Sequence, residues 1–334
     1  MRVLVLMGAL AVGFVFLSAV FVCLGARWVK AAKATFPRAL AAWGCVTVAS
    51  VLFLGIWKSI NDVRETSGAW ASCLAFVVLL GVELTVYFLL IKLLIKRLLG
   101  TSALRAFLAL LVGVIPQVLA AALVLLVIRP YVAQAFVLST NSMAPTILGP
   151  HFKVPCPRCG GTVFISPPPK DRLMIQTGPG ICGSCLAQEV HPFPSSHSLP
   201  PDHVFVDKLA APRRWDMVTF RSPSNPSVVW VKRVVALPGE EVVLKDGAVW
   251  VNGVKQTPPA PMARLEYAPL AGQRPGPLDS PDRPWRLKAD EFCVLGDFTT
   301  NSVDSRMIGA VPRSSIVGVV TVLYWPPARW QVWR

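Results

Sequence analysis

Residues 228–237 read VVWVKRVVAL, an apolar run interrupted only by two adjacent cations. Successive side chains of a β-strand point to opposite faces, so Lys232 shares its face with Trp230 and Val234. Apolar neighbours disfavour the charged ammonium, which lowers the pKa of a lysine. The run therefore predicts a strand that can hold Lys232 uncharged near neutral pH. Arg233 lies on the opposite face, where we expect its side chain to extend into solvent.

A second stretch, STNSMAPT at residues 139–146, follows a long apolar segment and predicts an exposed serine close to a membrane. A serine hydroxyl is a poor nucleophile at neutral pH and needs a neighbouring base. The chain has four histidines, His151, His191, His197 and His203. All lie in a proline-rich or cysteine-flanked stretch, which disfavours a catalytic triad with histidine as the base. Lys232 is therefore the better candidate base for Ser142.

Four segments resemble, in the same order, those of the type I signal peptidases (leader peptidases), which use a Ser/Lys dyad. They are SMAPT at 142–146, RWDMV at 214–218, KRVVALPG at 232–239, and the stretch from Gly296-Asp297 through NSVDSR at 301–306 to Gly309. The resemblance extends over residues 139–318. It implies a serine endopeptidase that removes signal peptides from exported preproteins, cleaving after small residues, with a mainly-β catalytic domain and no cofactor for catalysis.

The resemblance also implies a role for individual residues. Ser142 is the nucleophile that forms an acyl-enzyme, and Lys232 is the general base. The Thr140 hydroxyl and the backbone N–H of Ser142 form the oxyanion hole. The remaining expectations are that Ser302 orients the lysine amine, that Asp304 and Arg306 form a supporting ion pair, and that Met143 lines the substrate groove.

The first 130 residues are expected to form a transmembrane region. The chain has 334 residues, 54% of them hydrophobic, and a mean hydropathy of +0.55, which is too apolar for an ordinary soluble protein. Apolar stretches at 3–26, 39–57, 69–91 and 103–128 predict four spanning helices. Glu83, inside the third stretch, is either a functional intramembrane carboxylate or a residue facing another helix.

Charges in the connecting loops predict the orientation of these spans. The loops 27–38 and 92–105 carry only basic charges, whereas 58–68 is balanced, so the first and third loops face the cytoplasm. This predicts a multi-pass protein of the cytoplasmic (inner) membrane, in contact with the lipid bilayer. The catalytic domain, residues 131–334, then lies on the extracytoplasmic side.

The excess of basic residues does not indicate nucleic-acid binding. Residues 1–130 hold 12 basic and 3 acidic residues, and the rest of the chain holds 21 and 15, so 9 of the 15 excess charges precede residue 131. The soluble part shows no basic face of the kind that nucleic acid requires. We therefore expect no nucleic-acid partner.

Short β-rich runs dominate after residue 131 and predict an antiparallel, barrel-like β domain. The runs are 203–209, 215–221, 228–237, 241–245, 248–252, 291–296 and 316–324. The proline-rich stretch 255–289 is interpreted as a surface excursion of this domain. The last residues, 324–334, mix tryptophans with cations, and either contact the membrane interface or pack on the β domain.

Residues 151–200 form an insert that signal peptidases generally lack at this point. Its two Cys-x-x-Cys pairs, Cys156/Cys159 and Cys182/Cys185, have the spacing of a four-cysteine zinc ribbon. The alternative is disulfide or redox chemistry, which an extracytoplasmic location favours. A structural zinc is the preferred interpretation. Three roles are open for the insert: contact with substrate, gating of the cleft, or binding of a partner that the sequence does not identify.

Two other functions remain open at this point. One is a Ser/Lys processing peptidase with a narrow set of substrates, which the insert would impose. The other is a non-catalytic membrane scaffold that binds a partner through the zinc-ribbon insert. The presence of Ser142, Lys232 and Ser302 together argues against the scaffold.

Overall fold

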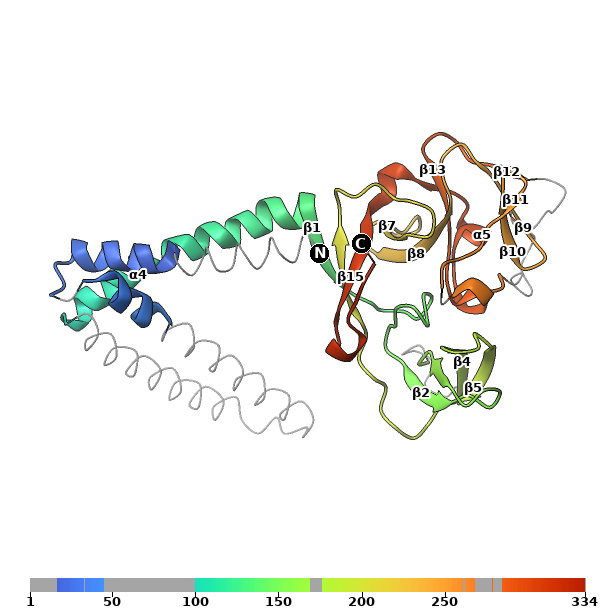
Figure 1. The fold of residues 1–334 in the computed structure, drawn as a ribbon, viewed down its shortest axis with the longest axis horizontal. Helices are drawn as coiled ribbons and strands as arrows, with labels where there is room; N and C mark the ends of the chain where they lie inside the picture. The colour runs from blue at the N-terminus through green and yellow to red at the C-terminus, as the bar shows by residue number, and fades with distance from the viewer. Residues whose placement is uncertain are drawn as a thin grey trace. The chain divides into compact units, whose positions relative to one another are not determined.

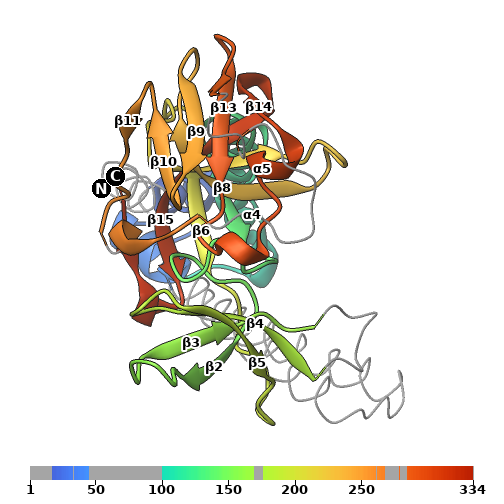
Figure 2. The same cartoon turned by 90° about the vertical axis from the view of Figure 1, so that its right-hand side faces the viewer.

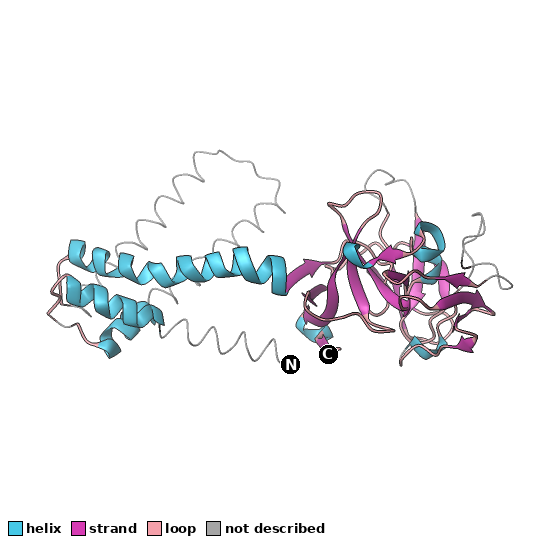
Figure 3. Cartoon of the chain, turned by 90° about the horizontal axis from the view of Figure 1, so that it is seen from above, coloured by secondary structure: helices cyan, strands magenta, loops and turns pink. Residues whose placement is uncertain are grey.

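The structure, a computed structural model, describes residues 17–32, 34–44, 100–168, 176–260, 262–267, 278 and 284–333. The chain divides into two compact units, Met1–Val127 and Ile128–Arg334. Described segments of the first unit are helical, and the second unit is mainly β-strand (Figure 3).

The helices described in the first unit overlap parts of the predicted membrane spans. Residues 17–28 and 36–44 are helical, and α4 (Ala103–Leu123) is followed by a π-helix, Val124–Val132. The predicted span 69–91 with Glu83 lies outside the described residues, as do much of 3–26 and of 39–57. Among the helices of the described ranges, none combines the length and the apolar character needed to cross a bilayer.

The second unit is built on an antiparallel sheet with strand order β1-β6-β15-β7-β8-β13-β14, and β16 pairs with β15. Figure 1 labels β1, β7, β8, β13 and β15 among its strands. The strands are β1 (Ala133–Val137), β6 (His203–Asp207), β7 (Met217–Arg221), β8 (Val229–Ala236), β13 (Glu291–Leu295), β14 (Val311–Pro312), β15 (Ile316–Trp325) and β16 (Gln331–Val332). Among the described residues, these pairings form a path from β1 to β14 and not a closed ring. The mainly-β expectation is confirmed.

Strand β8 lies between two parts of the hydrophobic core. Val234 packs in one cluster with Phe220 and Phe292, whereas Val235 packs in another cluster with Leu244. Every residue from 232 to 236 is buried. A strand covered on both faces is apolar at successive positions and does not alternate. This explains the nearly continuous apolar run at 228–237.

A smaller antiparallel sheet extends the same unit, with strand order β11-β10-β9-β12. Its strands are β9 (Glu241–Lys245), β10 (Ala248–Val251), β11 (Val254–Lys255) and β12 (Trp285–Arg286). The proline-rich stretch 255–289 is more than a surface excursion. Its described residues Met262, Leu265, Tyr267 and Leu278 are buried in the core cluster beneath this sheet, so the expectation for this stretch was wrong in that respect.

The insert folds as a four-stranded antiparallel sheet of its own, which Figure 2 shows as a separate group of strands. Its strands, in order, are β2 (Phe152–Pro155), β3 (Thr162–Ile165), β4 (Thr177–Cys182) and β5 (Gln188–Pro192). His151 and Leu199 pair where the insert begins and ends, with N–O distances of 3.2 and 2.7 Å. The insert therefore leaves and re-enters the β domain at one point.

Short helical turns complete the second unit: Met262–Arg264, Thr299–Asn301, α5 (Ser305–Ile308), Arg313–Ser315 and Pro327–Arg329. The last of these brings the C-terminal segment onto the β domain. Arg329 Nη2 lies 3.0 Å from Asp202 Oδ2, whose side chain is wholly buried, and Val332 pairs with Val322. This segment packs in part on the β domain, while Trp325 and Trp330 are exposed, and its contact with the membrane interface stays a prediction.

Candidate active site

The structure brings Ser142 and Lys232 into direct contact. Ser142 lies in the turn that follows β1, and Lys232 is the fourth residue of β8. A hydrogen bond joins Lys232 Nζ to Ser142 Oγ at 2.5 Å. The lysine is 4% exposed, and the serine is half-buried. The candidate base and the candidate nucleophile, 90 residues apart in sequence, are thus within proton-transfer distance.

Burial lowers the pKa of Lys232 from its ordinary value of 10.5 to about 8. Loss of hydration is the largest cause, because the ammonium is removed from water. The carboxylates of Asp304 and Asp297 oppose this shift in pKa, and the guanidinium of Arg306 adds to it. Desolvation outweighs the two carboxylates, so part of the amine is uncharged close to neutral pH.

Arg233, the neighbouring cation, does not extend into solvent. It is 5% exposed, and its Nε and Nη2 donate to the two carboxylate oxygens of Asp297 at 2.7 and 2.6 Å. The expectation of a solvent-exposed arginine was wrong because β8 is covered on both faces. A buried guanidinium requires a carboxylate partner and further acceptors, and the carbonyl of Trp215 accepts a third hydrogen bond at 2.8 Å.

The same ion pair anchors the turn that carries Ser142, the candidate nucleophile. Thr146 Oγ1 donates to Asp297 Oδ2 at 2.5 Å, and the backbone N–H of Phe298 donates to the carbonyl of Ser142 at 3.1 Å. On the other side, the N–H of Gly149 donates to Asn141 Oδ1 at 2.9 Å. These bonds fix the backbone before and after Ser142, which limits the positions available to its Oγ.

Gly149 is required where this turn folds back on itself. A β-carbon at residue 149 would lie 2.7 Å from the backbone C and O atoms of Thr140. Thr140 itself is exposed and lies at the cavity described below. Its predicted role in an oxyanion hole stays a prediction.

Three further predicted residues lie on the segment 296–306. Asp304 and Arg306 form an ion pair with a distance of 2.7 Å between Nη2 and Oδ2, and both side chains are fully buried. Ser302 Oγ is buried and has no hydrogen-bond partner among the residues that the structure describes. The structure therefore shows no bond from Ser302 to the lysine amine. A β-carbon on Gly296 would lie 2.1 Å from Ser302 Oγ and 2.7 Å from the carbonyl O of Ser142, so this segment packs directly on the nucleophile's backbone.

A cavity of about 710 Å³ opens beside the dyad. Its walls come from the end of β1, the turn 139–143, the start of β8 and two segments of the insert, around residues 166–168 and at Pro179. Met143 lies in this wall, but its side chain is 1% exposed and packs in a core cluster with Ile147 and Met217. Most of its surface therefore contacts the core, and only a small part is available to the cavity.

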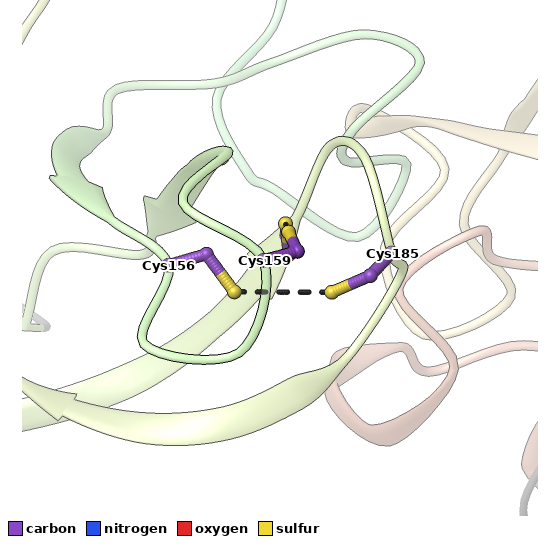
Figure 4. Close-up of side chains that lie close together, drawn as sticks. Cys156, Cys159 and Cys185 are labelled. Atoms are coloured by element: carbon purple, nitrogen blue, oxygen red, sulfur yellow. Dashed lines mark hydrogen bonds between the residues drawn. The ribbon is translucent and has the colours of Figure 1, made fainter.

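The four cysteines of the insert form one cluster. Cys156 Sγ lies 3.8 Å from Cys185 Sγ, and Cys159 Sγ lies 3.6 Å from Cys182 Sγ. All four sulfur atoms lie within 4.8 Å of one another, and none is in a disulfide. Figure 4 shows Cys156 and Cys185 pointing toward each other, with Cys159 beside them. The two Cys-x-x-Cys pairs, 22 residues apart, therefore converge on one point.

The part played by Arg233, Asp297 and Thr146 was not predicted from the sequence. Asp297 was noted only as part of a matching segment, and no partner was assigned to it. One signal was available for Arg233: the run 228–237 is apolar at successive positions, which is typical of a strand buried on both faces. The identity of its partner, 64 residues away, could not be read from that pattern.

Comparisons with known proteins match a large part of the chain to one family. The family model "Signal peptidase, peptidase S26" matches residues 190–325. A signal peptidase I of Leptolyngbya laminosa is 35% identical over 156 residues, covering 42% of this chain and 70% of that protein. The chain belongs to the signal peptidase I family. The residues that match the family model include Lys232, Asp297 and Ser302 and begin after the cysteine cluster.

Other signal peptidases give matches of different extent. The signal peptidase I of Pseudomonas aeruginosa is 30% identical, covering 35% of this chain and 51% of that protein. The signal peptidase I of Mycobacterium tuberculosis is 29% identical over 231 residues, covering 62% of this chain and 70% of that protein. A crystal structure of a signal peptidase I from Enterococcus faecalis V583 matches with 28% identity and a TM-score of 0.27, covering 34% of this chain and 98% of that one.

Replacing Lys232 with methionine is expected to stabilise this signal peptidase at neutral pH. The pKa of Lys232 is about 8 in the folded chain, against an ordinary value of 10.5. Between pH 8 and pH 10.5 the unfolded chain therefore binds more protons than the folded chain, and the free energy of unfolding rises with pH. The buried amine costs about 3 kcal/mol below pH 8 and nothing above the unfolded pKa. Urea unfolding at pH 7 should show a higher free energy of unfolding for Lys232→Met than for the wild type. At pH 10.5 this difference should be smaller.

The exposed Lys255 provides a matched control for this measurement. Lys255→Met should leave the free energy of unfolding within about 0.5 kcal/mol at both pH values. A gain for Lys232→Met that is the same at pH 7 and pH 10.5 would show that packing, and not the charge of the amine, causes it.

Proposed function

We propose that this chain is a membrane-bound signal peptidase I that cleaves exported preproteins, with Ser142 as the nucleophile and Lys232 as the general base. The observation that carries the assignment of these roles is the 2.5 Å contact between Lys232 Nζ and Ser142 Oγ. Family membership supports the reaction, and the contact supports the choice of residues.

The lowered pKa makes this dyad chemically useful. With a pKa of about 8, roughly one lysine in ten is neutral at pH 7. With the ordinary pKa of 10.5, only about one in three thousand would be neutral at the same pH. The neutral amine accepts the proton of the Ser142 hydroxyl as Oγ attacks the scissile carbonyl. The resulting ammonium then donates that proton to the leaving amine, and the acyl-enzyme remains on Ser142.

The second half of the reaction uses the same residues. A water molecule attacks the acyl carbon while Lys232 accepts its proton, and Ser142 leaves as the alcohol. In both halves the negative oxygen of the tetrahedral intermediate is bound by the Ser142 N–H and the Thr140 hydroxyl. Removing one donor of this kind usually lowers the rate about 10²- to 10³-fold. Ser302 is buried beside Gly296, and its Oγ has no partner within the described part of the chain, so its hydroxyl is available to orient the amine.

The cavity beside the dyad supports binding of an extended, largely apolar peptide. Val229, Trp230 and Val231 line one wall beside Lys232, and Phe136, Val137 and Leu138 line another. The resemblance to signal peptidases implies that small residues precede the cleavage site. Because Ser166, Pro167 and Pro179 of the insert line the same cavity, a narrow set of substrates is the second candidate function.

We also propose four membrane spans within residues 1–130, with the β domain on the extracytoplasmic side. The apolar stretches and the basic loops 27–38 and 92–105 support this topology. Cleavage of a preprotein added outside intact spheroplasts is the expected result, and cleavage only after lysis would reject it.

The cysteine cluster supports a structural zinc site in the insert. Zn–S bonds of about 2.3 Å in a tetrahedron place neighbouring sulfurs about 3.8 Å apart. The two measured Sγ–Sγ distances are 3.6 and 3.8 Å. Four thiolates with no open position are typical of zinc that stabilises a fold, so zinc has no part in the cleavage steps.

The proposed dyad predicts the effect of two single substitutions. Ser142→Ala removes the nucleophile and Lys232→Ala removes the base, so each should lower kcat by at least about 10³-fold in cleavage of a purified preprotein. Ser224→Ala, on a surface loop, should leave kcat unchanged. An active Lys232→Ala enzyme would contradict the dyad, and an inactive wild type would leave a non-catalytic scaffold as the better interpretation.

The proposed zinc site predicts the metal content of the purified chain. Elemental analysis should find about one zinc per chain in the wild type. Cys182→Ser should lose it, whereas Cys293→Ser, at a buried cysteine outside the cluster, should retain it. A metal-free wild type with the four thiols oxidised would reject zinc and favour disulfide chemistry.

A further inference from the structure

The insert binds the segment 299–301 through two side chains, and Gln188 makes most of the hydrogen bonds. Its Oε1 accepts hydrogen bonds from the Thr300 backbone N–H and the Thr300 hydroxyl, both at 2.9 Å. Its Nε2 donates to Thr299 Oγ1 at 3.0 Å. Asn301 Nδ2 adds a bond to Ser166 Oγ at 3.1 Å, again from the β domain to the insert. Three consecutive residues of the β domain are thus bound to the insert.

That short segment is directly connected to the nucleophile. Phe298, the residue before it, donates its N–H to the carbonyl of Ser142. Ser302, the residue after it, packs on Gly296 next to the same carbonyl. A shift of residues 299–301 therefore changes the position of Ser142 from two directions.

Apolar contacts join the same parts of the molecule. Phe164 of β3 and Ile181 of β4 form one buried cluster with Ala144, Leu148 and Phe298. Ala144 and Leu148 belong to the turn of the nucleophile, and Phe298 belongs to the bonded segment. The insert thus packs against the turn that carries Ser142 and against Phe298, which is bonded to that turn.

Gln188 is also closely linked to the cysteine cluster. It follows Cys185 by three residues and lies opposite Ile181, next to Cys182, in the pairing of β4 with β5. The turn between these strands is closed by hydrogen bonds from Cys182 N to Ala187 O at 2.9 Å and from Leu186 N to Cys182 O at 3.1 Å. The position of Gln188 therefore depends on how this cysteine turn is held.

We propose that Gln188 is a positioning residue of the peptidase: it transmits the state of the four-cysteine cluster to the nucleophile turn, so that full turnover requires Zn²⁺ in the insert. This inference rests on the proposed function, and it adds a requirement that the Ser142/Lys232 chemistry does not contain. Gln188 touches no reacting atom. Its effect is to hold residues 298–302, and with them Ser142, in the reactive arrangement.

The test compares three variants of the full-length protein in preprotein cleavage. Gln188→Ala should lower kcat about 10- to 100-fold with KM within about threefold, because a displacement of about 1 Å at a reacting group has effects of this size. Gln188→Glu keeps an acceptor for the Thr300 N–H and should recover most of kcat. Glu189→Gln, at the next residue of β5 in an exposed ion pair with Arg158, should match the wild type.

A second measurement does not depend on activity. Amide hydrogen exchange in a peptide covering 298–302 should be faster in Gln188→Ala than in the wild type, and unchanged in Glu189→Gln. Removing Zn²⁺ from the wild type with a chelator should accelerate exchange there and lower kcat to a similar extent. Adding Zn²⁺ alone should reverse both effects.

The outcomes separate this inference from the proposed function. A wild type that cleaves preprotein, with Gln188→Ala equal to it in kcat and exchange, would overturn the positioning role and leave the dyad standing. A wild type that does not cleave would overturn the proposed function, and unchanged exchange in Gln188→Ala would overturn the coupling as well. Equal kcat with and without Zn²⁺ would overturn the metal requirement.

Discussion

The structure of the site depends on one buried amine held against one hydroxyl. Lys232 is 4% exposed, yet its Nζ bonds to Ser142 Oγ. Water would stabilise the ammonium and raise its pKa, leaving almost no neutral amine at pH 7, so the surrounding side chains must exclude water while leaving room for a substrate. The strand β8 meets this requirement because both of its faces are covered by separate core clusters. The consequence is an intrinsic instability at neutral pH, as expected for a group kept away from its preferred charge state.

The neighbouring cation shows how two basic residues in one strand are given opposite properties. Arg233 is equally buried but keeps its charge, because Asp297 binds its guanidinium at two atoms. Lys232 has no carboxylate at hydrogen-bonding distance among the described residues, and Asp304 is engaged by Arg306. The ion pair of Arg233 with Asp297 also holds Thr146. The charged Arg233 therefore fixes the turn that carries Ser142, the proposed partner of the uncharged Lys232.

The sequence predicted much of the β domain and the dyad. The apolar runs located β6, β7, β8, β9, β10, β13 and β15, since each contains residues that must be buried, and two Cys-x-x-Cys turns indicated a common point for four sulfurs. Partners of buried polar groups were harder to predict. Tertiary packing pairs Arg233 with Asp297 and Arg329 with Asp202. No local sequence pattern indicates either partner. The contacts of Gln188 with 299–300 were missed for the same reason, because they join segments 111 and 112 residues apart.

The account rests on an amine that loses its proton near neutral pH beside the nucleophile. The most direct measurement is the rate of Ser142 acylation in single-turnover experiments with the full-length enzyme, followed from pH 6 to pH 11, where only the protonation state of the base should limit the rate. The account predicts that the rate rises with pH and levels off with a midpoint near 8, the pKa of Lys232. A midpoint above pH 10, or a rate that does not depend on pH, would contradict it.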